Sequence, residues 1–168
     1  MFLSLDPSSR VIGYAIFQDN LLMVWANVKI TGIGAHRFLA IEELLDQLTS
    51  QSQYTIDEIA MEVPKWRNTK KPAHSFFVAI DIIRKWAKSH KLPLFEYPPA
   101  TIKKSVTGNG HATKEKVARI LCLEYPELAE DIYGHATDSV AVAIHHLGVK
   151  RIEAMEVNKN GNSKGNAS

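Results

Sequence analysis

Cysteine is nearly absent from this chain of 168 residues, since Cys122 is the only one. A single thiol excludes an internal disulfide and a zinc site built on cysteines. No apolar run approaches the roughly 20 residues that a transmembrane helix needs. The first residues, MFLSLDPSSR, lack the basic segment and the long apolar run of a signal peptide. We therefore expect a cytoplasmic protein without membrane association.

An excess of one charge sign is also lacking, because the formal net charge is only +2. Positive charge is nevertheless concentrated in two segments, KWRNTKK (65–71) and the stretch from Ile102 to Arg119. Either segment alone is typical of a solvated charged face, but together they favour an anionic polymer as the partner. Trp66 could stack on a base, or it could anchor its loop to the core. The predicted DNA-binding residues are Lys65, Trp66, Arg67, Lys70, Lys71, Lys103, Lys104 and Lys114.

The hydrophobic pattern predicts an α/β fold with a mixed five-stranded sheet and helices on both faces. Three strands joined by short turns form an antiparallel meander, and strands then alternate with helices. Predicted strands cover residues 2–6, 10–18, 20–30, 56–63 and 92–97. Predicted helices cover residues 34–51 and 73–90, and further helices follow Pro99, follow Thr113 and begin at His135. We expect one domain over residues 1–155 and a disordered polar tail over residues 156–168.

The predicted helix over residues 73–90 has a wide apolar face. Its apolar side chains cover an arc of roughly 220°, about twice what a surface helix of a monomer needs. Either the helix is deeply buried in its own domain, or one side packs on the sheet and the other meets a second subunit.

Two carboxylates follow apolar strands, where a charge is costly unless it is paired or bound to metal. Asp6 ends the first predicted strand and Glu62 ends the fourth. Ligand sites in α/β sheets lie at the carboxyl ends of strands, so the two side chains converge if these strands are neighbours. The alternative for Asp6 is a simple turn residue.

The last predicted helix begins with His135 and Asp138, which are three positions apart and share one face. Together with Asp6 and Glu62 they would suit two divalent cations about 3.5–4 Å apart, an arrangement used to hydrolyse phosphodiesters. Helix capping by Asp138 is the structural alternative. His145 and His146 lie about 15–16 Å further along the helix, and we attribute them to favourable placement near its C-terminus.

Four segments resemble, in order and spacing, the RuvC-like Holliday-junction resolvases of the RNase H superfamily. They are LDPSSRVIGYAI, IAMEVP, YPPATIKKSVTGNGHATKEKV and GHATDSVAVAIHH, and they extend across nearly all of residues 2–148. The resemblance implies an RNase H-like fold, a homodimer, and paired nicking of four-way DNA junctions with Mg²⁺. Two ions per active site are expected, with Mn²⁺ able to substitute.

The resemblance also assigns site residues. It implies that Asp6, Glu62 and Asp138 are metal ligands, with His135 at the family's fourth acidic position. Lys103 and Lys114 match the family's functional lysines and complete the predicted catalytic set.

The chain departs from the family pattern in three places. Ser8 replaces the usual glycine after Asp-Pro, and His135 stands where many members carry Asp. The stretch after Glu62 lacks the common Gly-Gln-Ala-Arg-Gly pattern, which leaves the cleavage preference open. We expect a junction-resolving endonuclease. The alternatives are a relaxed-specificity nuclease for branched DNA and a non-catalytic junction-binding protein on the same fold.

Overall fold

The computed structural model describes residues 1–8, 10–32, 34–50, 54–64, 74–131 and 133–162. Its centre is one five-stranded sheet in the order β3-β2-β1-β4-β5. The strands are β1 (Phe2–Pro7), β2 (Val11–Gln18), β3 (Leu21–Lys29), β4 (Glu58–Glu62) and β5 (Leu94–Tyr97). β1, β2 and β3 pair antiparallel, whereas β1–β4 and β4–β5 pair parallel. The predicted mixed sheet is confirmed, and β1 and β4 are neighbours.

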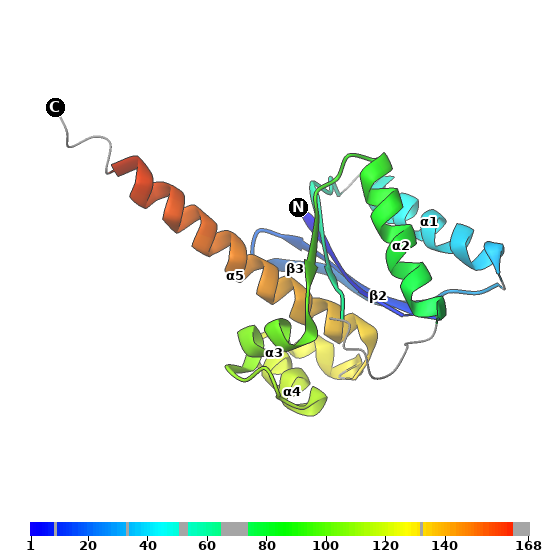
Figure 1. The fold of residues 1–168 in the computed structure, drawn as a ribbon. Helices are drawn as coiled ribbons and strands as arrows, with labels where there is room; N and C mark the ends of the chain where they lie inside the picture. Colours follow the sequence, from blue (N-terminus) through cyan, green and yellow to red (C-terminus); the bar gives the residue numbers. More distant parts are fainter. Residues whose placement is uncertain (9, 33, 51–53, 65–73, 132, 163–168) are drawn as a thin grey trace.

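Helices cover both faces of the sheet (Figure 1). They are α1 (Ala35–Ser50), α2 (His74–Ser89), α3 (Pro99–Thr107), α4 (Lys114–Glu124), a 3₁₀ turn (Pro126–Asp131) and α5 (His135–Asn162). Alternate residues of β1 divide between two apolar cores. Leu3 and Leu5 pack toward α1 and α2, whereas Phe2 packs with residues of α3, α4 and α5. Asp6 therefore follows the register of Phe2 and faces the α5 side.

The wide apolar face of α2 is explained by burial within the chain. Ala79, Ile80, Ile83, Trp86 and Ala87 are each at most 4% exposed and belong to the core shared with α1. Trp86 also donates its indole N–H to Asp46 of α1 at 2.7 Å. The width of the arc therefore gives no argument for a second subunit at these positions.

The helix α5 continues further than we expected. Residues 156–162 are helical, although we predicted disorder from residue 156. The side chains of residues 151–159 are exposed, and this end of α5 projects beyond the sheet (Figure 1). Extending an existing helix costs far less than nucleating one, so a polar sequence can continue it without tertiary contacts. No described helix is long and apolar enough to cross a membrane.

The length of α5 makes our interpretation of His145 and His146 wrong, because both lie in mid-helix rather than near its end. His146 is fully buried, with its ring centroid 4.8 Å from that of Phe2. Its Nε2–H donates to the carboxylate of Glu58 at 3.1 Å, and its Nδ1 accepts the Tyr97 hydroxyl at 2.7 Å. Burial lowers the pKa of His146, which keeps the imidazole neutral in this network.

Candidate metal centre and active site

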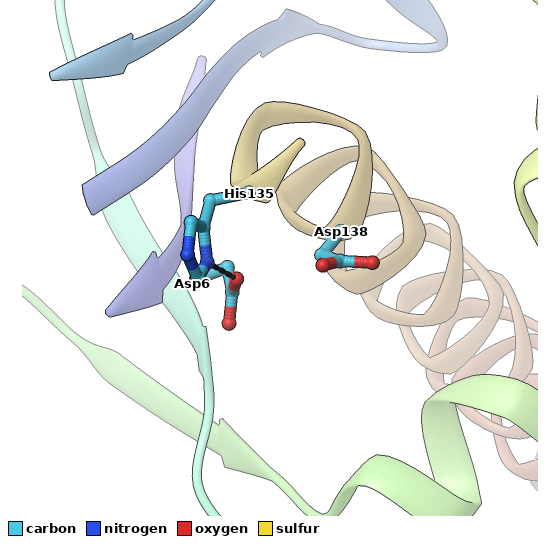
Figure 2. A group of neighbouring side chains, drawn as sticks. All are labelled: Asp6, His135 and Asp138. Carbon is cyan, nitrogen blue, oxygen red and sulfur yellow. Dashed lines mark hydrogen bonds and ion pairs between the residues drawn. The ribbon is translucent and has the colours of Figure 1, made fainter. Parts of the chain in front are cut away.

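Asp6 meets His135 because α5 begins directly against β2. Asp6 is the register partner of Gly13, and a Cβ added at Gly13 would lie 2.0 Å from the carbonyl carbon of His135. Glycine is required where two backbones approach this closely. Nδ1 of His135 consequently lies 2.5 Å from a carboxylate oxygen of Asp6 (Figure 2). This contact is the main reason why the pKa of His135 is raised above its usual value.

The start of α5 is held from β3 by Asn27. Its side-chain oxygen accepts the backbone N–H of Ala136 at 2.7 Å. The first N–H groups of a helix have no partner within the helix, so Asn27 acts as a cap supplied by another element. Gly13 and Asn27 thus position the histidine and the aspartate of α5, and our sequence analysis named neither. A glycine inside a strand is a signal of close backbone approach, whereas Asn27 carries no comparable signal.

Asp138 lies one turn beyond His135 on the same side of α5 (Figure 2). Its carboxylate accepts a hydrogen bond from the ammonium of Lys114 at 2.6 Å, so Asp138 contacts a lysine of α4. Burial raises the pKa of Asp138, and Asp6 adds to the rise, whereas the hydrogen bond from Lys114 lowers it. Ligand atoms of Asp6, His135 and Asp138 all lie within 4.8 Å of one another.

Glu62 lies in the wall of the same cleft. The cleft has a volume of about 220 Å³, and its charged lining residues are Asp6, Glu62, Lys103, Lys114 and Asp138. Burial raises the pKa of Glu62 to about 7, and repulsion by Asp6 and Asp138 adds to the rise. Three carboxylates therefore share a cleft in which a cation would relieve their repulsion.

The two lysines reach the cleft from consecutive helices, joined by a loop over residues 108–113. Gly108 ends α3 with a φ of 75°, and a Cβ on Gly110 would lie 2.8 Å from the carbonyl oxygen of Ala100. The hydroxyl of Thr113 accepts the N–H of Lys116 and caps α4. Gly108 and Gly110 are therefore required by the path of the backbone itself, whether or not the loop binds a phosphate.

The structure places most of the predicted residues at one edge of the sheet. Asp6, His135 and Asp138 form one group of possible metal ligands. Glu62, Lys103 and Lys114 line the same cleft as Asp6 and Asp138. Lys104 is exposed on α3 and does not line this cleft. The remaining predicted DNA contacts lie outside the described residues and stay predictions; they are Lys65, Trp66, Arg67, Lys70 and Lys71.

The donor set fits divalent metal ions. Carboxylate oxygens suit Mg²⁺ and Mn²⁺, and an imidazole nitrogen is accepted better by Mn²⁺. Burial is the main cause of the raised pKa of Glu62, and Asp6 and Asp138 add to it, so a bound cation would relieve part of this cost.

The burial of Glu62 and its repulsion by Asp6 and Asp138 give a testable effect on stability. A carboxyl whose pKa rises from 4.5 to about 7 destabilises the fold by up to about 3 kcal/mol above pH 7, and the penalty disappears as the pH falls toward 4.5. We therefore expect Glu62→Gln to raise the melting temperature in EDTA by several degrees at pH 8 and hardly at pH 5. The exposed Glu43→Gln serves as the control. An equal change at both pH values would contradict this account of the cleft.

The solved structures similar to this chain include Thermus thermophilus RuvC in complex with a Holliday junction substrate. The TM-score is 0.70 and the sequence identity 19%, over 91% of this chain and 97% of the other. The sheet order and the helices on both faces match, so the fold is RNase H-like.

Sequence comparison then identifies the family. The family model described as "Crossover junction endodeoxyribonuclease RuvC" matches residues 2–146. Proteins of that name from Cytophaga hutchinsonii and Dehalococcoides mccartyi are each 30% identical to this chain. The first match covers 87% of this chain and 75% of the relative, and the second covers 86% and 89%. The chain belongs to the RuvC family of crossover junction endodeoxyribonucleases.

Proposed function

We propose that this protein is a metal-dependent endonuclease that resolves four-way DNA junctions by hydrolysing two phosphodiester bonds. One observation carries the proposal: Asp6 and Glu62 at neighbouring strand ends share one cleft with Asp138 of α5. The cleft belongs to a chain of the RuvC family, whose members are named for cutting crossover junctions. The preserved set of carboxylates argues against a binding protein without catalytic activity.

The four proposed ligands are Asp6, Glu62, His135 and Asp138. Two Mg²⁺ ions, or Mn²⁺ in their place, would neutralise charge on the scissile phosphate and lower the pKa of the attacking water. Asp6 has the most central position, because it is hydrogen-bonded to His135 and raises the pKa of both Glu62 and Asp138. A ligand contact through Nδ1 of His135 requires that its proton be absent and its hydrogen bond to Asp6 be given up.

Lys103 and Lys114 are proposed to hold the substrate phosphate. In the DNA-free protein Lys114 is paired with Asp138, which keeps its ammonium at the cleft. A phosphate that enters the cleft would compete with Asp138 for this ammonium, and Asp138 would then be available for metal. An ammonium can make this exchange because its long side chain is flexible and its donors rotate.

Substrate range separates the junction resolvase from the relaxed-specificity nuclease. The altered segment after Glu62 motivates the second candidate. Four-way, three-way, flap and linear duplex DNA, each with Mg²⁺, Mn²⁺ or EDTA, form the test. We expect the four-way junction to be cut fastest, and no cutting in EDTA. Equal rates on three-way and flap DNA would favour the relaxed-specificity nuclease, and binding without cutting would overturn both nuclease proposals.

A homodimer is part of the proposal, because one cleft per chain can cut one strand at a time. A two-fold dimer would present two clefts to opposed strands of a symmetric junction. We expect light scattering at micromolar concentration to give twice the chain mass of 18.8 kDa. A monomer mass together with intact paired nicking would contradict the dimer.

A further inference from the structure

A basic surface lies outside the cleft, at the same end of the strands as the metal centre. An open groove of about 480 Å³ runs between the turn after β1, the end of β3 and the start of α1. Its charged lining residues are Arg10, Lys29 and Arg37, and no acidic residue is among the described residues that line it. None of these three side chains forms an ion pair with a described residue.

The cations of this groove are held by local structure. The hydroxyl of Ser8 donates to the carbonyl of Val11 at 2.6 Å and accepts the N–H of Val11 at 3.0 Å, which fixes the turn that carries Arg10. Ser8 is the residue that replaces the family's usual glycine. The N–H of Ile30 donates to the carbonyl of Arg10 at 2.8 Å, which joins this turn to the end of β3.

Arg37 is oriented from the other side of the groove. Its guanidinium donates through Nε and Nη2 to the carbonyl of Gly32, at 3.3 and 3.1 Å. Gly32 has a φ of +99°, which turns the chain between β3 and α1 and favours glycine. The remaining guanidinium N–H groups have no described protein acceptor, and a phosphate oxygen would supply one.

The register places this groove near the metal centre. Asp6 pairs with Gly13, whereas Lys29 pairs with Val11, which precedes Gly13 by two residues in β2. Two residues along a strand and two strand spacings across the sheet give about 12 Å between the backbones of Asp6 and Lys29. Duplex DNA rises 3.4 Å per nucleotide on each strand, so roughly four base pairs would span this separation.

We propose that this groove, here named the Arg10 groove and formed by Arg10, Lys29 and Arg37, binds the phosphodiester backbone of a duplex arm next to the cut site. The chemistry fits, because three cations in a groove with no acid among its described lining residues match an anionic backbone and release its counterions. The proposal rests on the proposed function for the identity of the cut site, but the groove recognises the DNA backbone itself.

The test removes the charge and keeps a polar side chain at each position. The triple variant Arg10→Gln/Lys29→Gln/Arg37→Gln is compared with Lys85→Gln/Lys88→Gln/Lys91→Gln, which removes three exposed charges near the end of α2. Binding to a four-way junction and to linear duplex is measured in EDTA over a range of salt concentrations. The groove triple should weaken binding to both DNAs by at least tenfold at 0.1 M salt. It should also reduce, by two to three, the slope of the logarithm of the binding constant against the logarithm of the salt concentration. Each phosphate contact is expected to contribute about 0.9 to this slope.

The outcome for the groove is separate from the outcome for the nuclease. Binding in EDTA does not depend on cutting. A protein that binds DNA but never cuts it would overturn the proposed function, and the affinities of the two triple variants would still test the Arg10 groove. Equal losses of DNA affinity in the two triple variants, or an unchanged salt dependence, would overturn the proposed role of the Arg10 groove. The absence of DNA binding by the wild-type protein would overturn it as well.

Discussion

Asp6→Asn is expected to reduce junction cutting by about a thousandfold or more and to leave junction affinity within about threefold. The substitution keeps the shape of the side chain and removes one negative charge from the group that Asp6 forms with His135 and Asp138. Loss of one carboxylate ligand costs several kcal/mol of transition-state stabilisation, and each 1.4 kcal/mol is about tenfold in rate. DNA affinity depends mostly on lysine and arginine contacts with phosphates, which the substitution leaves in place.

The matched control is Asp19→Asn, which makes the same chemical change in the turn between β2 and β3. Asp19 has a φ of 55°, a conformation that asparagine also tolerates, so the control should fold and cut normally. The rate is measured under single turnover at saturating Mg²⁺. Strong nicking by Asp6→Asn would contradict the assignment of Asp6 to the active site.

The second large effect is a competition between protons and metal. Burial and the neighbouring carboxylates raise the pKa of Glu62 to about 7, and the hydrogen bond to Asp6 raises the pKa of His135. Both groups must lose their protons to bind metal, so metal affinity falls as the pH falls through these pKa values. Each proton displaced costs up to tenfold per pH unit below its pKa. We expect Mn²⁺ affinity to be roughly a hundredfold weaker at pH 6 than at pH 8.

Variants at residue 135 distinguish the effect of the proton on His135 from that of the proton on Glu62. His135→Ala should bind Mn²⁺ more weakly at pH 8 and lose only about tenfold on going to pH 6, because Glu62 remains as the titrating group. His135→Asp supplies the carboxylate that many relatives carry, and we expect it to retain cutting where His135→Ala is much slower. The exposed His111→Ala is the control. Calorimetry without DNA measures the affinities, and an unchanged pH dependence in His135→Ala would show that His135 does not bind metal.

The strands and helices could be predicted because their hydrophobic patterns are strong and local. Asp6 and Glu62 were predictable as partners because both end apolar strands, and β1 and β4 are indeed adjacent. The resemblance to the RuvC family supplied the roles of Lys103 and Lys114, and it favoured metal binding by Asp138, for which spacing alone left helix capping open. The structure places both lysines and Asp138 in one cleft, and their roles in catalysis stay predictions.

What the sequence could not give depends on contacts between distant segments. The close approach of Gly13 to His135 and the cap that Asn27 provides both join residues more than 100 positions apart. The burial of His146 likewise depends on its contacts with Phe2 of β1 and Tyr97 of β5. The Arg10 groove combines three cations that are scattered in the sequence and form no basic run.

The central claim is that this cleft cuts junction DNA with divalent metal. The most direct measurement adds Mg²⁺ to a preformed complex of the wild-type protein with a four-way junction and maps the products on all four strands. The account predicts nicks at symmetric positions on two opposed strands, giving two duplexes whose nicks can be sealed by ligase, and no nicks in EDTA. A stable complex that leaves every strand intact in Mg²⁺ and in Mn²⁺ would contradict it.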